Sequence, residues 1–292
     1  MRKIADRLLG AAVGALCLLS VLILAFMVLF IVRESLPAIR EVGLRDLLLG
    51  DQWRPIIYRD APSYGLRNMI LSTLYVSVLA VALALVLGVG CALFLACAAT
   101  ERQRALVMPC IDLLAGIPSV VYGFVGLYIV IRAIEACGRA AGESILAGGI
   151  VLSVMILPYM ISACCETMVH VRERYGAASR AMGVSRWYMA GALVLPASRR
   201  GILISMALAT GRAMGETMAV MMVLGNAIAS PSLLGKGETI SALIALEMGM
   251  AEVGSIHFSA LYAAGLVLMV LLFAINIGFE LVKRKLSREG SL

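Results

Sequence analysis

An uncharged stretch in the first third of the chain decides the class of fold. Residues 68–98 read NMILSTLYVSVLAVALALVLGVGCALFLACA, without one charged side chain. A soluble domain would interrupt such a stretch with the charged face of a helix. A helix crosses the hydrocarbon core of a bilayer with about 20 apolar residues, so the stretch predicts a transmembrane helix.

The composition extends this interpretation to the whole chain. Hydrophobic residues make up 62% of the 292 residues and charged residues only 15%, and the mean hydropathy is +0.97. Soluble globular proteins carry more charge and less apolar surface. We therefore expect an all-α integral membrane protein with about six transmembrane helices, the others lying near residues 8–32, 107–131, 145–166, 201–224 and 258–282.

The first apolar stretch follows a basic N-terminus and could be mistaken for a signal peptide. It runs for about 25 residues, longer than the apolar region of a signal peptide, and no A-x-A-like cleavage site follows it. We expect a retained anchor helix. The predicted division of the chain is an anchor helix and extracytoplasmic loop in residues 1–67, a transmembrane domain in residues 68–282, and a tail in residues 283–292.

Lys and Arg are distributed unevenly over the two sides of the predicted spans. Their larger share lies on the side of the two termini, at Arg2, Lys3, Arg7, Arg102, Arg104, Arg172, Arg174, Arg180, Arg186, Arg199, Arg200, Lys283, Arg284, Lys285 and Arg288. The positive-inside rule therefore predicts that both termini are cytoplasmic. The net charge of +7 then belongs to cytoplasmic loops, and we expect no nucleic-acid partner.

Cysteine and histidine give no sign of a metal or redox site. The seven cysteines form no C-x-x-C pair and lie mostly inside apolar stretches, and the only histidines are His170 and His257. Ligand spacing of the kind that holds zinc is absent from this pattern. We expect no cofactor bound by this chain.

A distinctive loop separates predicted spans four and five. Residues 175–187 read YGAASRAMGVSRW and residues 193–196 read LVLP. A Gly turn between two short helices would form a compact knob that a soluble protein can grip. The alternative is a basic amphipathic loop lying on anionic lipid headgroups, which its arginines and Trp187 would also permit.

Predicted span five contains two charges, in the sequence GRAMGETMAVMMVLGN at residues 211–226. If the helix begins near Gly201, Arg212 lies about 17 Å along its axis, near the membrane centre. A charge at that depth costs about 2.5 to 3.5 kcal/mol. We expect Glu216 on the same helical face, so the two charges either neutralise each other or line a polar pathway together with Thr217.

The pathway is favoured over simple neutralisation for two reasons. Arg before Glu is the weaker order for an i, i+4 pair. An apolar pair would also avoid the desolvation cost of both charges.

Predicted span three is interrupted by helix breakers, in the sequence AGIPSVVYGF at residues 115–124. Pro118 removes a helix hydrogen bond and Gly123 loosens the helix nearby, so a kink or a break is expected. Ser119 and Tyr122 would then offer hydroxyls near the membrane centre. A kinked helix without a functional role is the alternative.

Together these three segments resemble the phosphate-specific permeases of ABC importers over residues 68–282, and G-E-T-M-A-V followed by L-G-N is more similar to the PstC-type than to the PstA-type subunit. The loop between spans four and five resembles the EAA loop of ABC importer permeases. Its Gly-to-Pro spacing matches the family pattern, which favours docking over headgroup binding. Ala177 stands where the family usually has Glu, and Leu193 where it has Ile.

The resemblance implies a type I ABC importer permease fold in a bacterial or archaeal plasma (inner) membrane. It implies a second, PstA-type permease subunit, a dimer of ATP-binding cassette ATPases that uses ATP and Mg, and an extracytoplasmic phosphate-binding protein. This chain has no G-x-x-x-x-G-K-[ST] loop, so ATP hydrolysis is expected in the separate ATPase subunits. The residues implied in ATPase coupling lie within about 172–196 and are Ala178, Ser179, Gly183, Arg186, Leu195 and Pro196.

Other functions remain as alternatives. The chain could serve an importer of phosphonate, molybdate or sulfate, or could be the PstA-type subunit. A membrane enzyme or sensor subunit is disfavoured, because the predicted spans show no cluster of acids, His or Cys.

Overall fold

The computed structural model describes residues 2–55, 62–138 and 141–289. Five of its helices are long and apolar enough to cross a membrane, and a sixth span arises if the bent pair Arg186–Ala197 and Arg199–Gly215, inclined at 62°, is counted as one. The expectation of an all-α membrane protein with about six spans is confirmed. In the described part, the only strands are the two-residue strands β1 (Trp53–Arg54) and β2 (Ser63–Tyr64), paired antiparallel.

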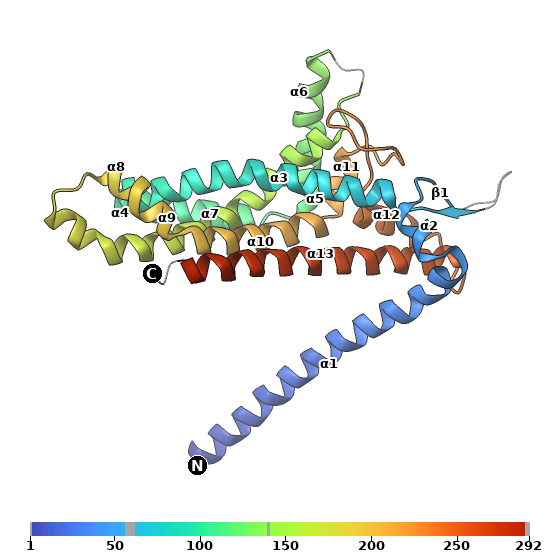
Figure 1. Ribbon diagram of the computed structural model, residues 1–292, viewed down its shortest axis with the longest axis horizontal. Helices are drawn as coiled ribbons and strands as arrows, with labels where there is room; N and C mark the ends of the chain where they lie inside the picture. The colour runs from blue at the N-terminus through green and yellow to red at the C-terminus, as the bar shows by residue number, and fades with distance from the viewer. Residues whose placement is uncertain (1, 56–61, 139–140, 290–292) are drawn as a thin grey trace.

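The long helices lie roughly along the longest axis of the molecule (Figure 1). They are α3 (Arg67–Leu93), continued by the π-helical segment η1 (Phe94–Ala98), α7 (Ile145–Ala181), α10 (Arg199–Gly215) and α13 (Ile256–Glu289). The shorter segments between them are α2 (Leu44–Leu49), α4 (Glu101–Ala115), α5 (Ser119–Val125), η2 (Gly126–Val130), α6 (Ile131–Ala136), α8 (Arg186–Tyr188), η3 (Met189–Val194), α9 (Leu195–Ala197), α11 (Met218–Val223) and α12 (Ile240–Glu247).

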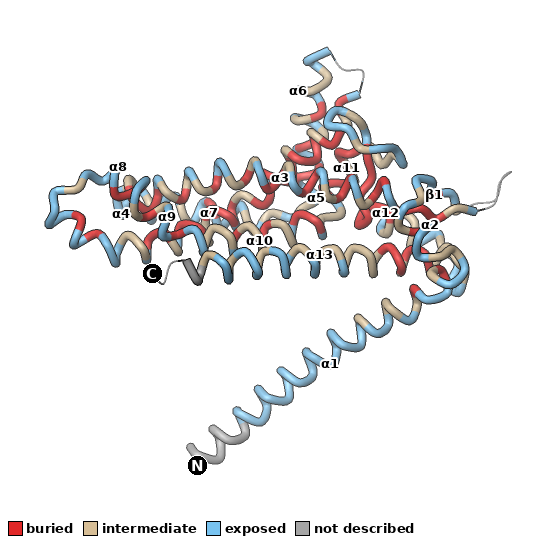
Figure 2. The backbone as a smooth tube through the Cα atoms, in the orientation of Figure 1, coloured by how far each residue is buried: buried red, intermediate tan, exposed pale blue. Residues whose placement is uncertain are grey.

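The first helix, α1 (Arg2–Val42), diverges from the bundle. It approaches α13 near one end, where Phe30 packs edge-on against Tyr262 with ring centroids 5.6 Å apart. None of the residues in its most apolar stretch is buried, and its tube is mostly pale blue in Figure 2, with intermediate and buried residues toward its C-terminal end. An apolar helix that exposes most of its length is stable only in lipid, as expected of a membrane anchor.

The core is centred on the contact between α3 and α7, the most extensive one between two helices. Small residues allow the close approach: a Cβ added at Gly88 of α3 would lie 2.8 Å from the Met160 side chain of α7. Ala80 and Ala84 are fully buried on α3, as are Leu152 and Ile156 on α7. Small residues let membrane helices approach until side chains interdigitate, which supplies the dispersion energy that holds them together.

A second cluster joins the first loop to the C-terminal helices. The Trp53 indole Nε1 donates to Glu247 Oε2 at 2.8 Å, and His257 Nε2 lies 2.8 Å from the same oxygen. The Trp53 and Tyr64 rings meet edge to face at 5.5 Å. The loop after α1 is thereby tied to α12 and α13 at the end of the bundle opposite the C-terminus (Figure 1).

Two predicted spans are broken in the structure. Predicted span three is divided into α4, which ends at Ala115, and α5, which begins at Ser119. The break at Pro118 agrees with the expected kink. Predicted span five ends as a helix at Gly215, and α11 begins only at Met218.

Predicted span four is longer than expected. It runs without a break to Ala181, well past residue 166. The prediction followed the apolar stretch alone, and the more polar segment after it continues the same helix.

Candidate functional site

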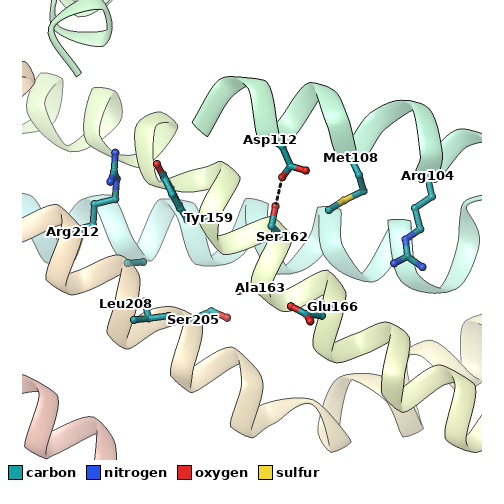
Figure 3. A pocket seen from close by; sticks show the side chains of 11 residues that line it. Arg104, Met108, Asp112, Tyr159, Ser162, Ala163, Glu166, Ser205, Leu208 and Arg212 are labelled. Carbon is teal, nitrogen blue, oxygen red and sulfur yellow. Dashed lines mark hydrogen bonds between the residues drawn. The ribbon is translucent and has the colours of Figure 1, made fainter. Parts of the chain in front are cut away.

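An open groove of about 610 Å³ lies between α4, α7 and α10. Its charged and polar lining is formed by Arg104 and Asp112 of α4, Tyr159, Ser162 and Glu166 of α7, and Ser205 and Arg212 of α10 (Figure 3). Charged side chains in the spans of a membrane protein are costly, so they gather where a polar cavity hydrates them. The groove is therefore the candidate functional site of this chain.

Arg212 projects into the groove from the last turn of α10. Its guanidinium carbon lies 4.3 Å from the centre of the Tyr159 ring, a cation–π contact. The Tyr159 hydroxyl in turn donates to the Ala115 carbonyl at 2.8 Å, one of the last carbonyls of α4. Tyr159 thereby connects the cation of α10 to the break between α4 and α5.

Glu216 does not lie on the same helical face as Arg212, which corrects the expectation from their spacing. α10 ends at Gly215, and Glu216 takes an extended backbone with φ −72° and ψ 131°, so the two residues do not share a helical face. No ion pair joins them in the described part of the chain. Instead, Glu216 Oε1 accepts from the Ala219 amide at 3.2 Å, and its carbonyl accepts from the Ser241 hydroxyl at 2.8 Å.

Glu216 therefore holds the break in the helix. Its carboxylate satisfies an amide at the start of α11 that has no partner within the helix. Thr217 begins the same turn, and its hydroxyl lies 3.4 Å from the Gly215 carbonyl. Both residues are half-buried beside the groove rather than among its lining residues.

The two residues expected from the Pro118 motif also stay outside the groove lining. Tyr122 is buried, and its hydroxyl donates to the Leu114 carbonyl at 2.7 Å. Ser119 is half-buried at the first position of α5. Tyr122 and Tyr159 thus donate to neighbouring carbonyls at the end of α4, those of Leu114 and Ala115. Of the five residues expected along the pathway, only Arg212 lines the groove.

Two carboxylates in the groove were not expected from the sequence. Asp112 accepts from the Ser162 hydroxyl at 3.2 Å, and Glu166 lines the same groove one turn further along α7. The available signal was that each acid falls inside a predicted apolar stretch, Asp112 in residues 107–131 and Glu166 in residues 145–166. The sequence does not show that these two stretches lie side by side, because α4 and α7 meet only in the folded chain.

The loop between predicted spans four and five forms a knob, defined here as residues 172–196. Gly183 makes the turn with φ +68°, a conformation that side chains with a Cβ disfavour. Ser185 then caps α8, its hydroxyl accepting from the Tyr188 amide at 3.3 Å. The first arm is the end of α7 rather than the separate short helix that was expected, because α7 runs unbroken to Ala181.

The residues expected to couple the chain to an ATPase lie on both arms of the knob. Ala178 and Arg186 are exposed, as is Pro196, which borders a hollow of about 540 Å³ between the arms. Leu195 is half-buried, and Ser179 is only 2% exposed. Residues 177 to 179 are small. They keep the first arm, the end of α7, narrow enough for a neighbour to approach its backbone.

A metal site is not evident in the structure. Within residues 2–55, 62–138 and 141–289, no three or more His, Cys, Asp or Glu side chains are grouped so that they could hold a metal ion.

Comparison with known proteins places this arrangement among transport proteins. Residues 84–288 match the family model described as binding-protein-dependent transport system inner membrane component. The chain is 35% identical to the probable ABC transporter permease protein YqgH of Bacillus subtilis over 78% of its length and 74% of that protein. It is 31% identical to the phosphate transport system permease protein PstC of Mesorhizobium japonicum, over 92% of its length and 87% of that protein.

A further relative and a solved structure agree with these matches. The probable phosphate transport system permease protein PstC of Methanocaldococcus jannaschii is 30% identical, over 94% of this chain and 91% of that protein. A chain of the MetNI methionine ABC transporter in an inward-facing conformation superposes with a TM-score of 0.59 at 15% identity, over 74% of this chain and 94% of that one. This last similarity concerns the fold alone.

Proposed function

Since this chain belongs to the family of binding-protein-dependent transport system inner membrane components, we propose that it is a permease subunit of an ATP-driven importer for inorganic phosphate. Relatives named phosphate transport system permease protein PstC match it over most of its length. The observation that carries the proposal for this chain is Arg212, a permanent cation held in a groove between three helices.

The groove supplies the chemistry that an oxyanion requires. The guanidinium presents a planar array of donors that can hold two oxygens of a phosphate at once. Stacking on Tyr159 limits the orientations that this array adopts, which reduces the entropy lost on binding. Asp112 and Glu166 oppose the positive charge, so the anion passes through the groove without being retained tightly.

The broken helices give the groove room to change shape. Glu216 and Thr217 hold the break between α10 and α11, and Ser119 and Tyr122 hold the break between α4 and α5. We assign these four residues to the pathway as positioning residues rather than as direct ligands. Discontinuous helices at the membrane centre are typical of substrate pathways in transporters.

The open side of the groove fits a second permease subunit. Leu208 lines the groove and is 67% exposed, which indicates an apolar rim for a neighbouring membrane protein. We assign that place to a PstA-type subunit. We also assign substrate delivery to an extracytoplasmic phosphate-binding protein and hydrolysis of ATP, with Mg, to a dimer of ATPase subunits that dock on the knob at Ala178, Ser179, Gly183, Arg186, Leu195 and Pro196.

The proposed orientation places both termini in the cytoplasm. The C-terminus and the turn between α7 and α8 lie toward one end of the molecule, and β1 lies toward the other (Figure 1). This arrangement supports an ATPase-facing end and an opposite end that faces the binding protein. The basic residues at the end of α13 support the same orientation through the positive-inside rule.

Uptake of radioactive phosphate by cells that lack this gene, with and without a plasmid copy, tests the proposal. We expect the plasmid to restore uptake, and an excess of unlabelled phosphate to compete for it. Competition by sulfate, molybdate or a phosphonate with no effect of phosphate would instead assign the chain to another oxyanion importer. An Arg212→Met copy is expected to restore no uptake, although it assembles normally.

A further inference from the structure

We propose that the knob fits an ATPase whose receiving groove has an apolar floor and an acidic rim. This inference rests on the proposed function, and it names the chemistry of the partner surface. The knob carries Arg172, Arg174, Arg180 and Arg186, and its only acidic residue is Glu173. A partner surface must carry opposite charge where these arginines approach it.

The tip of the knob supplies the apolar part of the interface. Met182, Trp187 and Tyr188 are 72%, 75% and 64% exposed, respectively. Residues of these types are enriched in protein interfaces and depleted from ordinary exposed surface. The three lie on both sides of the Gly183 turn, so a single groove can cover them together.

Beside this tip lies a hollow of about 480 Å³ with guanidinium groups around it. Arg180 and Arg186 line it and are exposed, and neither takes part in an ion pair found in the described residues. Arg172 lines it too, but its Nη1 donates to the Ala96 carbonyl at 2.8 Å and so belongs to the framework.

Acidic residues also line the hollow, namely Glu101 and Glu173. They leave a net positive lining, because three arginines stand against two carboxylates. Ala177 is exposed on the first arm of the knob and adds no negative charge. A carboxylate on the partner's rim would therefore meet a net positive lining beside Arg180 and Arg186.

The position of the knob favours a soluble protein over the membrane surface. Figure 1 shows the turn between α7 and α8 at the extreme end of the long axis, beyond the last turn of α13. Lys283, Arg284 and Lys285 lie in that last part of α13 and mark the level of the lipid headgroups. The knob thus extends past the headgroups, where a soluble subunit can surround it.

The test measures how salt affects the association of the ATPase subunit of the same transporter with the assembled permease pair in detergent. The variant is Arg180→Glu with Arg186→Glu, and the matched control is Arg102→Glu, an exposed arginine of α4 that does not line the hollow. At low salt we expect the double variant to associate about tenfold more slowly than wild type, and the control to associate as wild type does. The difference should shrink as salt screens the charges.

Three results would overturn the inference. They are salt-independent association of the wild type, unchanged association of the double variant, and weaker binding of the double variant only to vesicles that contain anionic lipid. The last result would assign the knob to the membrane surface. Phosphate uptake by the wild type is measured separately. If association of the ATPase does not depend on these arginines, the transport proposal still stands. If unlabelled phosphate does not compete for uptake, the transport proposal itself is rejected.

Discussion

The guanidinium of Arg212 lies 4.3 Å from the centre of the Tyr159 ring, whose hydroxyl is bound to the carbonyl of Ala115. The only cation that α10 contributes to the groove is thus oriented by α7 and linked to the end of α4. The direction in which the donors of Arg212 point therefore depends on how α4, α7 and α10 pack against one another.

The ring of Tyr159 should matter more than its hydroxyl. Tyr159→Phe keeps the cation–π contact and loses one hydrogen bond, so we expect phosphate uptake to fall by only about threefold. Tyr159→Leu loses both, and uptake should fall by about tenfold or more. Tyr128→Leu, at an aromatic residue that is 69% exposed away from the groove, is the matched control. Equal uptake by the Phe and Leu variants would show that the stacking plays no part.

Arg212 and Glu216 should respond independently to substitution, because they do not pair. Arg212→Lys should impair uptake, since a point charge does not reproduce the fork of donors. Glu216→Gln keeps an oxygen that can accept from the Ala219 amide, so its uptake should stay close to wild type. Glu216→Leu loses that acceptor, and the complex should be destabilised by about 1 kcal/mol.

The measurement for this pair is uptake normalised to the amount of assembled complex. The double variant Arg212→Met with Glu216→Leu should assemble and fail to transport. Wild-type uptake by that variant would reject the pathway role of Arg212.

Gly183 should tolerate Asn far better than Val. Its φ of +68° is accessible to Asn but strained for a β-branched residue, at a cost of about 1 to 2 kcal/mol. We expect Gly183→Val to insert normally and to lose both co-purification of the ATPase and phosphate uptake. Gly183→Asn should retain most of both. Because no atom lies within 4 Å of a Cβ added there, an equally inactive Asn variant would mean that partner crowding, rather than turn geometry, makes glycine necessary.

The proposed orientation can be checked with cysteines on exposed positions. Asp51→Cys should react with a membrane-impermeant maleimide from outside the cell, and Ser185→Cys only after the membrane is opened. Both residues are exposed, so a cysteine there is accessible to the reagent. Gly142 is unsuitable as a labelling position, because an added Cβ would clash with the Ile131 carbonyl oxygen and disturb the fold. Labelling of Asp51→Cys exclusively from the cytoplasmic face would contradict the orientation.

Glu238 should make the complex less stable as the pH rises. It is 5% exposed, and burial, with the nearby charge of Glu247, raises its pKa to about 7. The folded chain therefore holds this proton between about pH 4.5 and 7 where the unfolded chain has lost it, so stability falls across that window as pH increases.

Glu238→Gln removes the penalty of the buried charge. We expect the variant to be more stable than wild type at pH 8, by on the order of 3 kcal/mol, and equally stable near pH 4. Thermal unfolding of the purified complex at several pH values is the measurement. A wild type and a variant with parallel pH profiles would show that Glu238 is not the titrating group.

Local patterns in the sequence predicted the features that depend on neighbouring residues. Pro118 predicted the break in the third span, because loss of an amide acts on the helix that contains it. The Gly183 turn followed in the same way from glycine's access to positive φ. The expectation that Arg212 and Glu216 share a helical face was wrong, since it assumed that an apolar stretch with no proline continues as a helix. Contacts from Ser241 and Ala219 to Glu216 stabilise a break there.

The sequence by itself determined that this chain lies in a membrane, about how many times it crosses, and that Arg212 needs a polar environment, because these follow from transfer free energies of single residues and stretches. Only the tertiary structure decided what surrounds Arg212. Tyr159 contacts it from α7, Asp112 and Glu166 line the same groove, and the positions of all three depend on how α4, α7 and α10 pack. Packing is set by shape complementarity between small residues such as Gly88 and their neighbours, a relationship between distant segments that a linear pattern does not contain.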